Sequence, residues 1–244
     1  IMIIKEGGNI FKDANGRALT QRINQTDVKP TIAWLEQLTG LDLQDNALGS
    51  TGRKPTSGDL DLAVDANQVS KDQLHAKLSQ WAQSHGFKPD EYVRKSGISV
   101  HLKTPINGRP DNGYVQTDFM FLKDVPFSKF ILSAPGDSKY RGVDRNILIN
   151  SMAKSMGYKL SQVAGLMTRT EPPKLITNDP DQLAKILLNK RATANDLHSV
   201  ETIIAALAND PEKDAKLADA REHFAREGVP FFETAELKPV TGYT

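Results

Sequence analysis

Two aspartates one residue apart, in Asp59-Leu60-Asp61, have the side chains and the spacing to hold a metal ion. They begin an alternating apolar segment that extends to Val64 and predicts a strand, in which alternate side chains share a face. The two carboxylates therefore point to the same side and repel each other unless a cation compensates their charge. Carboxylate oxygens in this arrangement suit Mg²⁺ or Mn²⁺, which bind carboxylates together with substrate phosphates.

A third carboxylate, Asp118, lies in a second alternating segment, Tyr114–Leu122, which also predicts a strand. Phe119 and Phe121 share one face of this segment, so Asp118 lies on the other face. If the two strands are neighbours in a sheet, the three carboxylates converge. An isolated Asp-x-Asp pattern also occurs at solvated strand edges, and the residues before Asp59 help to separate the two interpretations.

A run of small, hydroxylated and basic residues, Leu48–Gly58, leads directly into Asp59. Its glycines let backbone N–H groups approach a polyphosphate, Ser50 and Ser57 can donate hydroxyl protons, and Arg53 can bind phosphate with its forked guanidinium. This order of residues predicts a site for a metal–triphosphate complex. The alternative is a flexible loop beside an acidic strand, which accounts for each residue but not for their order.

The Gly-Ser pair at 49–50, followed by Ser-Gly-Asp-Leu-Asp at 57–61, resembles the signature of the DNA polymerase beta-like nucleotidyltransferase superfamily. The resemblance is strongest to its family X polymerases and covers residues 48–64. It implies that Asp59, Asp61 and Asp118 hold two Mg²⁺ or Mn²⁺ ions. It also implies a group of residues that bind the nucleotide: Gly49, Ser50, Arg53, Ser57 and Gly58.

A second stretch, residues 138–161, is similar to the thumb segment of family X polymerases. The similarity implies that Asn146 contacts the incoming nucleotide. Arg145 replaces the aromatic residue usual before that Asn, and Asn150 stands where a template-contacting Arg is usual. The first 46 residues contain no counterpart of the family's helix-hairpin-helix DNA-binding region. These departures argue against templated synthesis and are compatible with nucleotidyl transfer.

The expected fold class is α+β, with a small mixed nucleotidyltransferase palm sheet, flanking helices and a helical C-terminal part. A helix is expected to begin near Pro30 and to stop at Gly40, and Ser70 with Gln73 predicts a capping box for a helix that closes near Gly86. The segments 97–103 and 114–122 are expected to form an antiparallel pair of strands. A further helix is expected over 144–156, and the pair Pro172-Pro173 is interpreted as a linker.

This organisation suggests four consecutive parts of the chain. They are an N-terminal segment with one helix, a nucleotidyltransferase palm, a thumb-like segment and a helical C-terminal region, over residues 1–46, 47–135, 136–174 and 175–244.

Composition narrows the possible classes of protein. The 244 residues are 39% hydrophobic and 25% charged, which is typical of a globular protein, and cysteine is absent, so disulfides and thiolate chemistry are excluded. There is no P-loop motif, and the five histidines show no ligand spacing, so each is expected at the surface or at a helix end. No apolar run is long enough to span a bilayer, and the simplest location is the cytoplasm.

Charge is distributed unevenly along the chain. Residues 139–174 contain seven basic and two acidic side chains, whereas residues 175–244 contain eight basic and twelve acidic ones. A basic stretch of this kind can bind nucleic-acid phosphates, although it also fits a solvated helix face.

Together these features predict an enzyme that moves a nucleoside monophosphate from an NTP or dNTP to an acceptor hydroxyl and releases pyrophosphate. The expected acceptor is an RNA or DNA 3′ end, extended without a template. Two alternatives stay open: transfer to a small molecule or a protein, and a silent module that binds a nucleotide or a partner without turnover.

Overall fold

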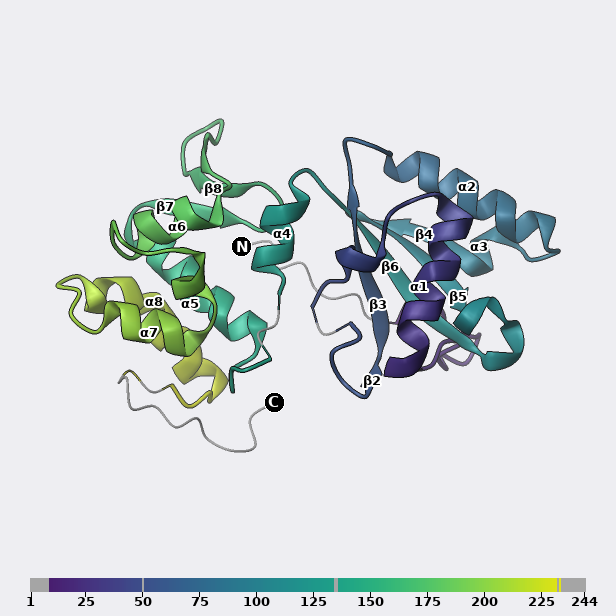
Figure 1. The fold of residues 1–244 in the computed structure, drawn as a ribbon, viewed down its shortest axis with the longest axis horizontal. Helices are drawn as coiled ribbons and strands as arrows, with labels where there is room; N and C mark the ends of the chain where they lie inside the picture. The colour runs from purple at the N-terminus through teal and green to yellow at the C-terminus, as the bar shows by residue number, and fades with distance from the viewer. Residues whose placement is uncertain (1–8, 50, 134–135, 232, 234–244) are drawn as a thin grey trace. The chain divides into compact units, whose positions relative to one another are not determined.

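The computed structural model describes residues 9–49, 51–133, 136–231 and 233, and Figure 1 shows the ribbon. The described chain divides into two compact units that meet at Val125 and Pro126 in the sequence. Each unit has its own hydrophobic core.

The N-terminal unit is built on a four-stranded mixed sheet with the order β3-β6-β5-β4. β3 and β6 are parallel, whereas β6 with β5 and β5 with β4 are antiparallel. The strands are β3 (Asp59–Asp65), β4 (Val93–Ser96), β5 (Ser99–Pro105) and β6 (Tyr114–Leu122). A separate two-stranded pair joins β1 (Ile23–Asn24) to β2 (Thr56–Ser57), which brings the segment before the first helix beside the segment before β3.

Three α-helices accompany this sheet: α1 (Gln25–Thr39), α2 (Lys71–Ser84) and α3 (Pro89–Tyr92). Short 3₁₀ turns cover Gln44–Asn46, Ile106–Gly108 and Pro110–Asn112. Helix α2 begins with the expected capping box, because the Ser70 hydroxyl accepts from Gln73 N while the Gln73 side chain accepts from Ser70 N. Helix α1 ends at Gly40 as expected.

The start of α1 differs from the prediction. The helix begins at Gln25, five residues before Pro30, so Pro30 lies inside the first two turns. A proline there loses the hydrogen bond that its own N–H would donate and crowds the carbonyl four residues earlier, and burial of Val28, Ile32 and Leu35 in the core offsets that cost.

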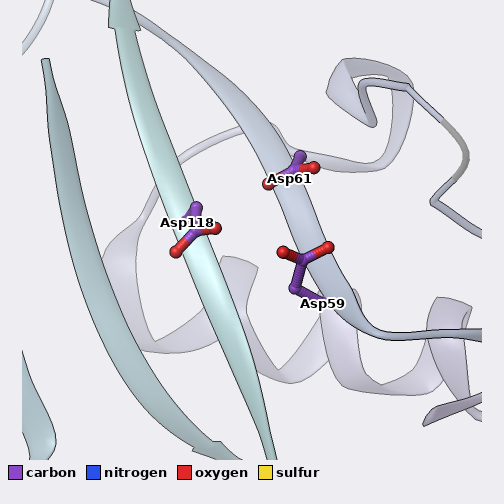
Figure 2. Close-up of side chains that lie close together, drawn as sticks. All are labelled: Asp59, Asp61 and Asp118. Atoms are coloured by element: carbon purple, nitrogen blue, oxygen red, sulfur yellow. The ribbon is translucent and has the colours of Figure 1, made fainter. Parts of the chain in front are cut away.

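Strand alternation decides which face of the sheet is buried under the helices. Leu60, Leu62 and Val64 of β3 pack in the same core as Leu35 of α1 and Leu78 of α2. Since side chains alternate along a strand, Asp59 and Asp61 lie on the opposite face. The sheet therefore presents its acidic residues on the face away from the helices, as the close-up in Figure 2 shows.

The C-terminal unit is largely helical and also contains a sheet. Its helices are α4 (Val125–Ile131), α5 (Gly142–Ser155), α6 (Pro180–Leu187), α7 (Val200–Leu207) and α8 (Lys213–Glu227), with a 3₁₀ turn over Ala194–Leu197. A three-stranded antiparallel sheet, which the sequence did not lead us to expect, consists of β7 (Tyr158–Ser161), β8 (Gly165–Thr168) and β9 (Leu175–Thr177).

The interpretation of Pro172-Pro173 as a linker is wrong. The two prolines lie in the connection between β8 and β9, which are paired in one sheet. Thr168 holds the two ends of this connection together, since its backbone N donates to Lys174 O at 2.9 Å and its hydroxyl accepts from Lys174 N at 2.8 Å.

The four expected parts of the chain therefore combine in pairs. Ile32, from the expected N-terminal segment, shares a core with Leu62 and Phe119 of the sheet. Leu148, from the expected thumb-like segment, shares a core with Phe224 of the last helix. Each pair of segments buries a common apolar surface, which explains why the boundary at Val125 and Pro126 separates two units rather than four.

Candidate metal centre

The three predicted carboxylates converge on one face of the sheet. Asp59 and Asp61 extend from β3, Asp118 extends from the neighbouring β6, and Asp61 is the register partner of Asp118 (Figure 2). Each carboxylate offers an oxygen, and these oxygens all lie within 4.8 Å of one another. The parallel pairing of β3 and β6 thus brings together residues that are far apart in the sequence, as predicted.

Burial makes this cluster electrostatically costly without a cation. The exposed fractions are 5% for Asp61 and 3% for Asp118, and Asp59 is half-buried. Oδ2 of Asp118 is buried and has no hydrogen-bond partner among the described residues. Because a buried carboxylate oxygen without a partner is unfavourable, and because like charges repel, the cluster could hold a metal ion with all-oxygen ligands.

The other oxygen of Asp118 is fixed by two side chains. His101 Nδ1 lies 2.6 Å from Asp118 Oδ1, and Gln116 Nε2 donates to the same oxygen at 3.0 Å. On its far side, His101 Nε2 lies 2.7 Å from Ser96 Oγ. An ionised Asp118 carboxylate accepts from His101 Nδ1–H, and the Ser96 hydroxyl, which can donate or accept, is the partner of the other ring nitrogen. These contacts fix the orientation of the Asp118 carboxylate and leave Oδ2 without a partner among the described residues.

His101 was expected at the surface or at a helix end, and that expectation is wrong. It is 4% exposed and lies on β5, opposite Asp118 in the antiparallel register. The sequence predicted that His101 lies in a strand. Its contact with Asp118 could not be predicted, because it depends on the register between β5 and β6. Gln116 could have been found, since it lies two residues before Asp118 and therefore shares its face.

The segment before β3 follows the outer edge of that strand. Leu48 N donates to Asp61 O at 2.8 Å, and the Thr51 hydroxyl accepts from Asp61 N at 3.0 Å. Further along, the Ser57 hydroxyl accepts from Gly52 N at 3.2 Å, which closes the segment on itself. The backbone on both sides of Asp61 is thereby tied to residues 48–57, and Thr51 joins the site although the sequence did not single it out.

The predicted nucleotide-binding residues of this segment lie close to β3 in the sequence and differ in exposure. Gly49 adopts a positive φ of 58°, which favours glycine, while Arg53 and Gly58 are exposed and Ser57 is buried. Ser50 lies outside the described residues. The proximity of this segment to Asp61 follows from the hydrogen bonds of Leu48 and Thr51.

Asn146, predicted to contact the nucleotide, lies in the C-terminal unit on α5. It is 7% exposed, its amide nitrogen donates to Ile131 O at 2.8 Å, and its amide oxygen accepts from Arg145. These bonds use both ends of the side-chain amide within the interior of the unit. A contact between Asn146 and a nucleotide stays a prediction.

Arg145 is 1% exposed, which no feature of its sequence context indicated. Its Nη2 donates to the carbonyl oxygens of Phe130 and Ile131 at 2.7 and 2.9 Å, and its guanidinium lies over the Phe130 ring. Burial lowers the pKa of Arg145 to about 10, since desolvation disfavours its charged form.

In the structure, three of the seven basic side chains of residues 139–174 are buried or ion-paired. Arg145 is buried, Arg141 bonds to Asp144 at 3.1 Å, and Lys154 bonds to Asp219 at 2.7 Å. The remaining basic side chains of the stretch are all exposed: Lys139, Lys159, Arg169 and Lys174.

No helix in the described ranges combines the length and the apolar character needed to cross a bilayer. Comparison with protein-family models gives no match to this chain, and a search of curated proteins also finds none.

Proposed function

We propose that the protein is a metal-dependent nucleotidyltransferase that moves a nucleoside monophosphate from an NTP or dNTP to an acceptor hydroxyl. One observation carries this proposal: the carboxylates of Asp59, Asp61 and Asp118 converge on neighbouring strands, with Oδ2 of Asp118 buried and unpartnered among the described residues, beside the Gly-Ser and Ser-Gly-Asp-Leu-Asp segment. The mixed sheet of residues 59–122 supports the interpretation of this unit as a nucleotidyltransferase palm.

In this proposal Asp59, Asp61 and Asp118 hold two Mg²⁺ or Mn²⁺ ions. Bound there, the ions supply positive charge that stabilises the attacking and leaving oxygens of an in-line displacement. Because Asp59 and Asp61 lie on the same face of β3, their negative charges are close together. His101 and Gln116 keep Oδ1 of Asp118 occupied, so Oδ2 is the oxygen available to the site.

The transfer is a balanced substitution at phosphorus. The acceptor oxygen bonds to the α-phosphorus, the bond from that phosphorus to the β-bridging oxygen breaks, and pyrophosphate leaves with the electron pair. The acceptor proton passes to a carboxylate oxygen of Asp118, in the role of general base, and then to solvent.

In this proposal the segment of residues 48–58 binds the triphosphate of the nucleotide. The exposed guanidinium of Arg53 suits the outer phosphates, and the positive φ of Gly49 turns the backbone beside β3. The anchoring of this segment to Asp61 by Leu48 and Thr51 gives it a fixed position relative to a metal ligand. Such fixed donors stabilise charge without reorganising during the reaction.

The first candidate acceptor is a polynucleotide 3′ end, extended without a template. Its support is the group of exposed basic side chains in the C-terminal unit, together with Asn150 in place of a template-contacting Arg. A small-molecule acceptor is the second candidate. It is favoured by the burial of Arg145 and by the ion pairs of Arg141 and Lys154, which remove three cations from the basic stretch.

The test offers each labelled NTP and dNTP with Mg²⁺ or Mn²⁺ to single-stranded RNA, single-stranded DNA, a recessed primer–template and a panel of small hydroxyl compounds. Metal-dependent pyrophosphate release with a labelled acceptor supports the proposal. Addition dictated by the template base would refute template independence. NTP binding without any pyrophosphate release would identify a silent nucleotide-binding module.

A further inference from the structure

A cavity of about 350 Å³, lined by residues with polar side chains and one glycine, opens next to the carboxylate cluster in the N-terminal unit. Asp59 and Gln116 line it. These two residues are register partners on β3 and β6 and lie two residues along each strand from Asp61 and Asp118. Asn9, Thr20, Gln21 and Arg22 line it from the segment before α1. The cavity therefore reaches the site where the proposed transfer takes place.

This cavity is separate from most of the segment assigned to the triphosphate. Leu48 and Thr51 bond to the backbone of Asp61 along the outer edge of β3. Among the described residues of 48–58, only Gly58 lines the cavity. The segment is therefore bonded to the backbone at Asp61, whereas the cavity opens at Asp59, which leaves the cavity as a separate place for a second substrate.

Arg22 gives the cavity a fixed cation. Its Nε donates to the Thr56 hydroxyl at 3.0 Å and its Nη2 to Thr56 O at 3.2 Å. In the described part of the chain no residue accepts a hydrogen bond from Nη1. A Cβ atom at position 58 would lie 3.2 Å from Nη1, so Gly58 leaves room for the guanidinium immediately before Asp59.

The chemistry of the lining indicates the ligand. Apart from Arg22 and Asp59, the described residues that line the cavity offer amides, a hydroxyl and a glycine, and no aromatic ring on which a base could stack. A guanidinium held by two hydrogen bonds loses little conformational freedom when it binds an anion, and its fork suits phosphate oxygens. The lining therefore suits an oxygen-rich, phosphate-bearing group.

We infer that this cavity holds the acceptor and that Arg22 binds a phosphate carried next to the reacting hydroxyl, an inference that rests on the proposed nucleotidyl transfer. Two sources offer this chemistry: the terminal nucleotide of a polynucleotide, and a small phosphorylated sugar. In either case the hydroxyl attacks the α-phosphorus as described above and Arg22 takes no part in bond formation.

The test compares charged and neutral acceptors. One pair is an RNA oligonucleotide with an ordinary or a methylphosphonate terminal linkage, and the other pair is ribose 5-phosphate and ribose. The wild-type protein should use the charged member of at least one pair with an acceptor KM about tenfold lower. Arg22→Gln should abolish that preference and leave the NTP KM within about twofold, whereas Arg53→Gln should raise the NTP KM and keep the preference.

Equilibrium binding of both charged probes, the oligonucleotide and ribose 5-phosphate, is measured in parallel for the wild type, Arg22→Gln and the charge-keeping Arg22→Lys, with far-UV circular dichroism to verify folding. Binding lost in Arg22→Gln without any transfer by the wild type would support the cavity and refute the proposed function. If Arg22→Gln weakens charged and neutral acceptors equally, Arg22 only balances the charge of Asp59 and the inference is wrong. Unchanged binding of both probes in Arg22→Gln, or binding of neither probe to the wild type, would also overturn it.

Discussion

His101 Nδ1 lies 2.6 Å from Oδ1 of Asp118, while Oδ2 of the same carboxylate is buried without a partner in the described chain. The two oxygens of one side chain therefore have different environments. Oδ1 is occupied by His101 and Gln116, and the carboxylate as a whole lies in the cluster with Asp59 and Asp61. Histidine and amide partners of this kind hold a ligand in position and leave its second oxygen for a cation.

The first prediction concerns the carboxylates. Asp59→Asn, Asp61→Asn and Asp118→Asn should each lower transfer by roughly a thousandfold, because each removes a charge that the metal ions need. Mn²⁺ binding, followed by electron paramagnetic resonance, should weaken in the same three variants.

The matched control is Asp65→Asn, at the far end of the same strand. Asp65 lies outside the metal cluster and accepts from Asn67 N at 2.8 Å. The Asp65→Asn variant should therefore keep both its Mn²⁺ affinity and its rate of transfer near the wild-type values. Normal turnover in Asp61→Asn, with the fold intact, would exclude the three-carboxylate assignment.

The second prediction tests His101 as a positioning residue. His101→Leu removes the donor to Asp118 Oδ1 and should lower both kcat and Mn²⁺ affinity about 10- to 100-fold. His101→Asn places an amide donor near the position of Nδ1 and should recover much of both.

A purely structural role for His101 makes a different prediction. In that case His101→Leu would lower thermal stability while the folded fraction kept its Mn²⁺ affinity, and His101→Asn would bring no selective recovery. His85→Leu, at an exposed helix end, provides the control for replacing an imidazole in this unit.

The third prediction separates binding from chemistry at Arg53. Arg53→Ala should raise the KM for the nucleoside triphosphate and lower kcat less, since a contact to the outer phosphates exists in both the ground state and the transition state. Steady-state kinetics with the acceptor saturating gives both constants. An unchanged KM would remove Arg53 from the site.

The fourth prediction is a pH dependence in the C-terminal unit. Burial is the largest single influence on the pKa of Asp210 and raises it. The hydrogen bonds from Lys216 Nζ at 2.6 Å and from Glu212 N at 2.8 Å, together with the charge of Lys216, lower it more, so the net pKa lies below the ordinary 3.8. A lowered carboxylate pKa contributes stability that is present above about pH 4 and is lost as the pH falls through the pKa of the folded state. Asp210→Asn should therefore cost about 2 kcal/mol at pH 7 and progressively less below pH 3.8.

Urea unfolding followed by circular dichroism measures this difference at each pH. Circular dichroism is used because the two tryptophans, Trp34 and Trp81, both lie in the N-terminal unit. Their fluorescence reports on that unit and not on the unit that contains Asp210. Asp214→Asn, whose carboxylate is 92% exposed beside Arg221, should change stability by no more than about 0.5 kcal/mol. An equal cost of Asp210→Asn at pH 7 and pH 3 would contradict the role of its ionised form.

Features that depend on local pattern could be predicted from the amino-acid sequence. Alternation around Leu60 and Leu62 placed Asp59 and Asp61 on one strand face, and the segment 114–122 corresponds to β6 in full. The capping box at Ser70 is also local, because its two hydrogen bonds join residues three apart. Hydrophobic periodicity and short-range bonds were sufficient for these elements.

Contacts between residues far apart in the sequence could not be predicted in this way, because they depend on how the strands and helices pair. His101 faces Asp118 because of the β5–β6 register, and Arg22 reaches Gly58 because β1 pairs with β2. Arg145 is a charged residue of a type usually exposed, and it is buried because backbone carbonyls of α4 accept its hydrogen bonds. Contacts of this kind join residues far apart in the chain, and local pattern carries no information about which of the many compatible pairings folding selects.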